Sequence, residues 1–102
     1  MKYGVYAVFD SKAEAYLAPF FHATDGTAKR EFGKVVQQKG HNFCEFPEDF
    51  TLMKLGVWDD ESAKFEELLT PFSLGVGLEY KKAGEPLGSE PYGFLKEMND
   101  AG

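Results

Sequence analysis

Residues 46–69, FPEDFTLMKLGVWDDESAKFEELL, decide the fold of this chain. Apolar side chains recur along residues 51–58 with the two-residue period of a β-strand. The short polar residues 59–62 are typical of a turn, because such side chains hydrogen-bond their own backbone. Residues 64–69 can then return as a second strand, so the whole stretch predicts a β-hairpin.

Two further strands are predicted at the start of the chain. Residues 2–9 alternate between Tyr3, Val5, Ala7 and Phe9 on one face and Gly4, Tyr6 and Val8 on the other. Residues 14–21 supply a second aromatic-rich strand. The connection between them is short, so we expect antiparallel pairing.

A helix is predicted over Asp25–Lys39. Thr24 or Asp25 can cap its first turn, and Gly40 follows its end. Apolar residues recur at the spacing of one helical face, namely Ala28, Phe32, Val35 and Val36.

The remaining segments predict little regular structure. Residues 41–47 form an irregular link into the hairpin, and Thr70-Pro71 ends its second strand. We expect a Gly-rich loop over residues 73–77 and a short extended segment over residues 78–80. Beyond it, Pro, Gly and polar residues without periodicity predict an extended tail, in which residues 94–98 can form one helical turn.

These elements predict an α+β protein with one domain over residues 1–82 and a polar, Pro/Gly-containing tail over residues 83–102. An antiparallel sheet of about four strands, in the order β-β-α-β-β, packs one face against a single helix. One helix cannot cover both faces of an aromatic-rich sheet, so we expect a homodimer. The alternative is a monomer whose tail covers the aromatic side chains.

Composition and charge limit the classes of function. The net charge of −6 is uneven, because residues 1–44 carry six basic and four acidic residues, whereas residues 45–102 carry five basic and thirteen acidic ones. Phosphate binding needs a basic surface. A single cysteine excludes an intramolecular disulfide, and no leader or membrane-spanning run is evident, so we expect a soluble cytoplasmic protein.

Catalytic and metal-binding patterns are weak. His22, His41 and Cys44 have no partner at a metal-ligand or nucleophile–base spacing. Asp59-Asp60-Glu61 lacks the spacing of a calcium loop, and Gly75-Val76-Gly77 lacks the rest of a phosphate loop. We therefore expect no catalytic residue, no metal and no cofactor.

Two surfaces are candidates for nucleic-acid binding. The first is the helix face with Lys29, Arg30 and Lys34, extended by Lys39, whose cations can follow a phosphate backbone; the alternative is an ordinary solvated helix face. The second is a sheet face on which strand alternation places Tyr6, Lys54 and Trp58, with Phe65 beside them. Aromatic rings near cations can stack on unpaired bases, or they can instead pack at a subunit interface.

Residues 1–82 also carry a series of short motifs: MKYGVY (1–6), DSKA (10–13), PFF (19–21), FPEDFTL (46–52), LG (55–56) and TPFSLG (70–75). In order and spacing they resemble the small non-structural protein of gokushoviruses, which are tailless Microviridae phages with single-stranded DNA genomes. The resemblance implies a DNA-binding protein of the host cytoplasm. It also implies a role in the switch from duplex replication to single-strand synthesis and packaging, without known catalytic residues.

Two functions remain open from the sequence. The first is a non-enzymatic phage accessory protein that binds single-stranded DNA or the replication complex. The second is an acidic protein–protein adaptor that acts on a phage or host replication protein without contacting DNA.

Overall fold

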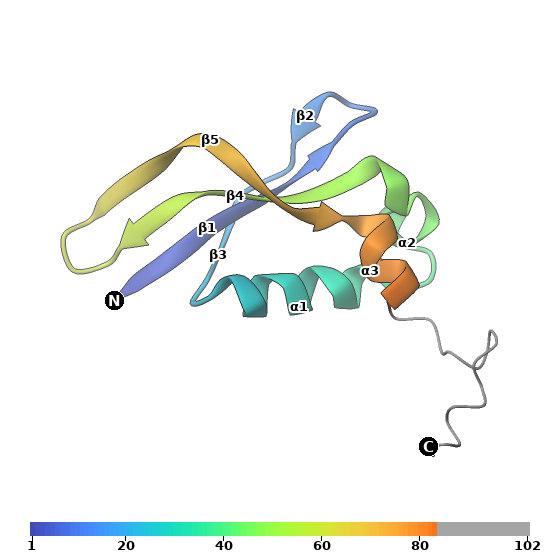
Figure 1. Ribbon diagram of the computed structural model, residues 1–102, viewed down its shortest axis with the longest axis horizontal. Helices are drawn as coiled ribbons and strands as arrows, with labels where there is room; N and C mark the ends of the chain where they lie inside the picture. The colour runs from blue at the N-terminus through green and yellow to red at the C-terminus, as the bar shows by residue number, and fades with distance from the viewer. Residues whose placement is uncertain (84–102) are drawn as a thin grey trace, which may run out of the picture.

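The computed structural model describes residues 1–83, which form a five-stranded antiparallel sheet above helix α1 (Figure 1). The strands are β1 (Lys2–Asp10), β2 (Ala15–Tyr16), β3 (Phe20–His22), β4 (Phe50–Asp59) and β5 (Lys64–Val76). The helices are α1 (Asp25–Val36), α2 (Asn42–Glu45), the 3-10 turn η1 (Pro47–Asp49) and α3 (Gly77–Ala83). The sheet order is β2-β1-β4-β5, and β3 also pairs with β1. The α+β class is confirmed; the tail prediction falls on residues 84–102, outside the described ones.

The predicted single strand over residues 14–21 is two short strands. β2 pairs with Phe9–Asp10 and β3 with Gly4–Tyr6, both antiparallel to β1. Pro19 lies between them and has no N–H for a ladder hydrogen bond, which is why one continuous strand does not form.

The β4–β5 hairpin is confirmed, but its second strand is longer than predicted. Thr70-Pro71 does not end β5, which continues to Val76 through the predicted Gly-rich loop. In the register, Gly56 faces Glu67 and Lys54 faces Phe72, so residues 68–71 oppose only Leu55. Pro71 therefore lies in a bulge, where the ladder needs no N–H from it.

A bulge in β4 also changes which side chains share a face. Val5 of β1 faces Gly56, whereas the next residue, Tyr6, faces Lys54, so Leu55 is an extra residue in β4. Directly opposite residues point to the same face of a sheet. Lys54 therefore lies on the face of Tyr6, and Trp58 lies on the other face, opposite Tyr3. The strict alternation expected along β4 is wrong.

Helix α1 begins as predicted and ends earlier. Thr24 is the N-cap, and its side chain accepts a hydrogen bond from the Thr27 backbone N–H. The helix ends at Val36, three residues before the predicted end at Lys39. Its apolar stripe packs against one face of the sheet and forms the core with residues of β1 and β4: Tyr6, Val8, Ala28, Phe32, Val36, Phe50 and Leu52.

The segments expected to be irregular contain short helices. Residues 41–47, predicted as a link, hold α2 and the start of η1, and residues 78–80, predicted as extended, lie in α3. Contacts of Tyr80 hold α3 against the core. Its ring lies 5.0 Å from that of Phe32, edge to face, and its hydroxyl donates to the Leu74 carbonyl at 2.7 Å. Within residues 1–83, no helix has the length and apolarity to cross a membrane.

Candidate nucleic-acid-binding and protein-binding surfaces

The predicted basic residues of α1 form an exposed surface, here called the α1 basic face: Lys29, Arg30 and Lys34. Lys34 Nζ lies 3.9 Å from Glu31 Oε1, with both side chains more than half exposed. An exposed pair at that distance contributes little energy, so it leaves the ammonium group open to other anions. Lys39 is also exposed, but it lies beyond the end of the helix.

The α1 basic face borders two hollows. Lys29 lines one beside strands β4 and β5, together with Thr51, Ser73 and Glu79. The other lies between α1 and α3 and is lined by Arg30, Gly33, Lys34, Gln37, Gln38, Tyr80 and Ala83. The two helices are tied together there, because Gln37 Nε2 donates to the Tyr80 carbonyl at 3.0 Å.

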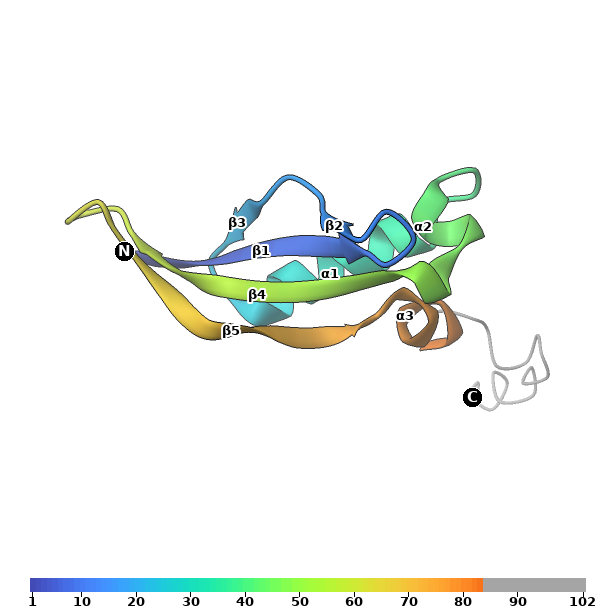
Figure 2. The same cartoon turned by 90° about the horizontal axis from the view of Figure 1, so that it is seen from above.

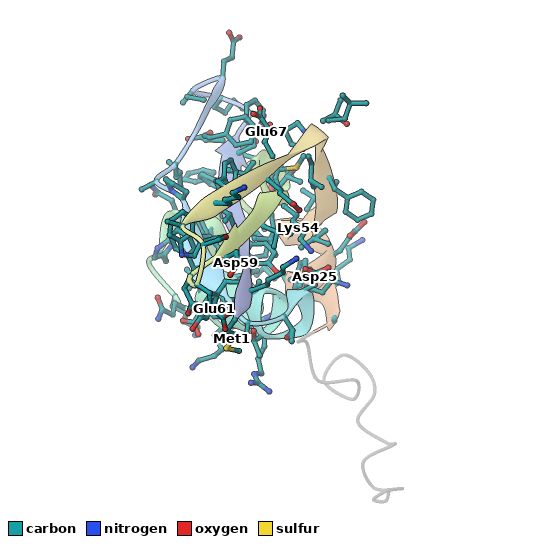
Figure 3. The ribbon with its side chains drawn as sticks, turned by 90° about the vertical axis from the view of Figure 1, so that its left-hand side faces the viewer. Met1, Asp25, Lys54, Asp59, Glu61 and Glu67 are labelled. Atoms are coloured by element: carbon teal, nitrogen blue, oxygen red, sulfur yellow. The ribbon has the colours of Figure 1, made fainter. Side chains whose placement is uncertain are left out.

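Tyr6 and Lys54 do not form the stacking surface that the sequence predicted. Tyr6 is fully buried in the core, and its hydroxyl donates to Asp25 Oδ1 at 2.6 Å. Lys54 Nζ lies 3.0 Å from the same oxygen. Figure 3 shows Lys54 and Asp25 near each other, and the register places Trp58 on the other face of the sheet. The two residues instead join β1 and β4 to the start of α1.

Tyr6, Asp25 and Lys54 shift one another's protonation equilibria in the direction that keeps their hydrogen bond and ion pair formed. The hydrogen bond from Tyr6, followed by the Lys54 ammonium group, holds the pKa of Asp25 below its ordinary value, against the opposing effect of burial. Burial, followed by the bond to Asp25, raises the pKa of the Tyr6 hydroxyl, which therefore remains a donor. The contacts among Tyr6, Asp25 and Lys54 therefore hold β1, β4 and α1 together.

The opposite face of the sheet carries six aromatic side chains that the sequence did not bring together. Figure 2 looks onto this face, with α1 behind the sheet. Trp58 faces Tyr3 on one side and Phe65 on the other. We call the set the open aromatic face: Tyr3, Phe9, Tyr16, Phe21, Trp58 and Phe65.

Tyr16, Phe21 and Phe65 are exposed and the other three rings are half-buried, so the face is a candidate contact surface. Phe21 is 53% and Phe65 is 49% exposed, although both are apolar. The Phe9 and Tyr16 rings pack together at the other end of β1, 4.9 Å apart. Clustered exposed rings are typical of binding surfaces, whereas single ones are common.

The charge beside the open aromatic face is negative. Asp60 lines a hollow with Tyr3, Phe21 and Trp58, and Glu67 faces Gly56 on the same side of the sheet. Among the strand pairs of residues 1–83, no lysine or arginine shares this face. The Met1 ammonium group pairs with Asp60 at 2.6 Å, so the aromatic rings are the main feature of this face and make it a candidate surface for an apolar partner.

The residues considered for catalysis have structural contacts. His41 Nδ1 accepts from the Phe43 N–H and so caps α2, and Cys44 is buried. The Met1 ammonium group contacts Asp60 at 2.6 Å and Glu61 at 3.2 Å. In the described part of the chain, His, Cys, Asp and Glu form no group of three or more placed to hold a metal.

Comparison with known proteins gives one match. The model of a family described as "Phage ORF5 protein" matches residues 3–80, which include both the α1 basic face and the open aromatic face. No curated protein and no solved structure matches the chain. Since the match spans most of the chain, this protein belongs to the phage ORF5 protein family.

Proposed function

We propose that this phage protein is a non-enzymatic accessory protein that binds single-stranded DNA, or the replication complex that carries it, through the α1 basic face. In the host cytoplasm it would favour the switch to single-strand genome synthesis and packaging. The gokushovirus resemblance of residues 1–82 supports this reading within the phage family. The observation that carries it is the exposure of Lys29, Arg30 and Lys34 on one helix.

The net charge of the protein limits the part of its surface that DNA can contact. With a net charge of −6, most of the surface repels DNA. The α1 basic face concentrates three cations within two helical turns, and Glu31 is the one carboxylate among residues 29–34. Phosphates can therefore approach here, whereas the open aromatic face presents Asp60 and Glu67.

The test is a titration of single-stranded oligonucleotides at several salt concentrations. In the variant Arg30→Ala/Lys34→Ala we expect weaker binding and a smaller salt dependence. If both cations contact phosphates, the slope of log K against log salt falls by about 1.4 in magnitude, at roughly 0.7 per phosphate of single-stranded DNA.

Lys12→Ala/Lys64→Ala is the matched control, because it removes the same charge from exposed positions outside α1. It should keep the parent's salt slope. Equal losses in the two variants would mean that only net charge matters, and the α1 basic face would not be the site.

The open aromatic face is proposed as the contact between two copies of the chain. Its exposed rings, with no lysine or arginine among its described strand pairs, fit a second apolar surface better than DNA, and a two-fold contact would cover the face on both copies. Because α1 lies on the other side of the sheet (Figure 1), pairing would leave two α1 basic faces on opposite outer sides.

Sedimentation at micromolar concentration should therefore report a dimer. Phe21→Ser/Phe65→Ser removes two exposed rings of the face and should shift the protein to a monomer. Phe72→Ser is the control: Phe72 is 60% exposed and lies opposite Lys54, on the other face of the sheet, so its loss should leave the dimer intact. A parent that stays monomeric at high concentration would refute the dimer.

The second candidate function is an adaptor for a phage or host replication protein. The open aromatic face favours it, since the face offers a partner exposed rings flanked by Glu67 and by the Asp60–Met1 ion pair. If the parent binds no oligonucleotide even at low salt, the adaptor becomes the better account.

A further inference from the structure

The hollow beside strands β4 and β5 combines an exposed aromatic ring with a lysine. Phe72 of β5, Lys29 of α1 and Glu79 of α3 line it, and its volume is about 540 Å³. That volume lies within the range of small-molecule sites, about 300–1,000 Å³. Phe72 is 60% exposed. Lys29 is exposed as well, and no ion pair among residues 1–83 includes it. The ring and the ammonium group together suit a ligand that has a flat ring next to a negative charge.

The hollow lies on the α1 side of the sheet. Phe72 faces Lys54 in the register, and Lys54 faces Tyr6, whose side chain packs in the core with α1. The open aromatic face is on the other side, so the hollow stays accessible when two copies pair through that face. Lys29 also belongs to the α1 basic face. A DNA strand held by the α1 basic face can therefore reach the hollow at Lys29.

One nucleotide of single-stranded DNA uses both groups. Its base has an apolar face that stacks on an aromatic ring, and its phosphate binds a lysine. A free phosphate or an acidic side chain would use Lys29 but leave Phe72 exposed. An apolar side chain of a protein partner would cover Phe72 but leave Lys29 unpaired. The chemistry of the hollow therefore favours a nucleotide.

The Glu79 carboxylate gives the hollow a hydrogen-bond acceptor. Gly75 leaves room for it, since a Cβ atom there would lie 2.9 Å from Glu79 Oε1. A carboxylate accepts a hydrogen bond from the N4 amino group of cytosine, whereas thymine has the acceptor O4 at the same position. Glu79 therefore favours cytosine over thymine.

We propose that the hollow holds one unpaired base of a bound DNA strand. The base stacks on Phe72, Lys29 binds an adjacent phosphate, and Glu79 accepts a hydrogen bond from an amino group of the base. The inference rests on the proposed function, to which it adds a site for a base and a preference among bases.

The first test compares the full chain with Phe72→Leu and Phe72→Tyr in titrations of oligo(dC) at several salt concentrations. Leucine is apolar but has no ring for stacking, so affinity should fall at least about fivefold with an unchanged salt slope. Tyrosine should keep the parent's affinity. Phe46→Leu is the matched control, because Phe46 is 52% exposed and does not line the hollow. Equal losses in the two leucine variants, or no loss in Phe72→Leu, would overturn the proposal.

The second readout is the ratio of affinities for oligo(dC) and oligo(dT). The parent should bind oligo(dC) more tightly. Glu79→Gln should reduce the ratio, because an amide can donate to thymine as well as accept from cytosine. Both oligonucleotides carry the same phosphates, so the charge that this substitution removes does not affect the ratio. Equal affinities of the parent for the two would reject the contact with Glu79.

The outcomes separate this inference from the proposed function. If Arg30→Ala/Lys34→Ala weakens binding and Phe72→Leu does not, the hollow is rejected and the α1 basic face remains the site. If Phe72→Leu weakens binding and Arg30→Ala/Lys34→Ala does not, the hollow is the site and the α1 basic face is rejected. A parent that binds neither oligonucleotide rejects both.

Discussion

Phe32→Ala is expected to lower the free energy of unfolding by about 3–5 kcal/mol, the range for truncating a buried aromatic side chain. Phe32 is 3% exposed in the middle of α1. Its ring lies 5.6 Å from that of Phe43 and 5.0 Å from that of Tyr80, so one side chain joins α1 to α2 and α3. Denaturant melts measure the change, which would remove much of a small domain's stability.

Phe72→Ala is the matched control for this loss. Phe72 is 60% exposed on β5, so the same truncation leaves no cavity and should cost under about 1 kcal/mol. A loss below about 1 kcal/mol for Phe32→Ala would contradict the packing of α1 against the sheet.

Helix α1 could be predicted because its determinants are local. The Thr24 cap and the positions of Ala28 and Phe32 follow from spacing along the chain. The exposed cations Arg30 and Lys34 follow from the same spacing, so the α1 basic face was found from the sequence. The end of the helix was less predictable, since residues 37–39 could continue it by propensity alone.

The open aromatic face could not be predicted because β-bulges are set by pairing between distant strands. Because Leu55 is one extra residue in β4, Trp58 and Lys54 lie on different faces of the sheet. Alternation within β4 alone therefore placed Tyr6, Lys54 and Trp58 together, which is wrong. The members contributed by β2 and β3, Tyr16 and Phe21, needed the registers with β1.

Helix α3 was missed for a related reason. Gly75 and Gly77 suggested a loop, and Gly75 does adopt a positive φ of 125°. Gly77 has another role, because a Cβ atom there would lie 2.6 Å from the Pro47 carbonyl oxygen. Contacts across the fold, and the packing of Tyr80 on Phe32, therefore decide the structure of this segment.

The cluster of Tyr6, Asp25 and Lys54 makes the free energy of unfolding depend on pH. Asp25→Ala is expected to cost about 1–3 kcal/mol near pH 7, because the Tyr6 hydroxyl, fully buried, loses the acceptor of its 2.6 Å hydrogen bond. In a Tyr6→Phe background the same substitution should cost less, since no buried donor remains to be satisfied. Equal costs in the two backgrounds would show that the hydrogen bond is not the source of the loss.

The sign of the pH dependence follows from Asp25. The hydrogen bond from Tyr6, and then the ammonium group of Lys54, lower the pKa of this carboxyl in the folded chain. A lowered carboxyl pKa stabilises the fold above the unfolded value, about 3.9, and that stability is lost as pH falls through the folded value. The difference in unfolding free energy between parent and Asp25→Ala should thus be constant above about pH 5 and shrink below about pH 4. Urea melts from pH 3 to pH 7 measure it, and a difference that stays constant across that range would mean that the Asp25 charge does not stabilise the fold.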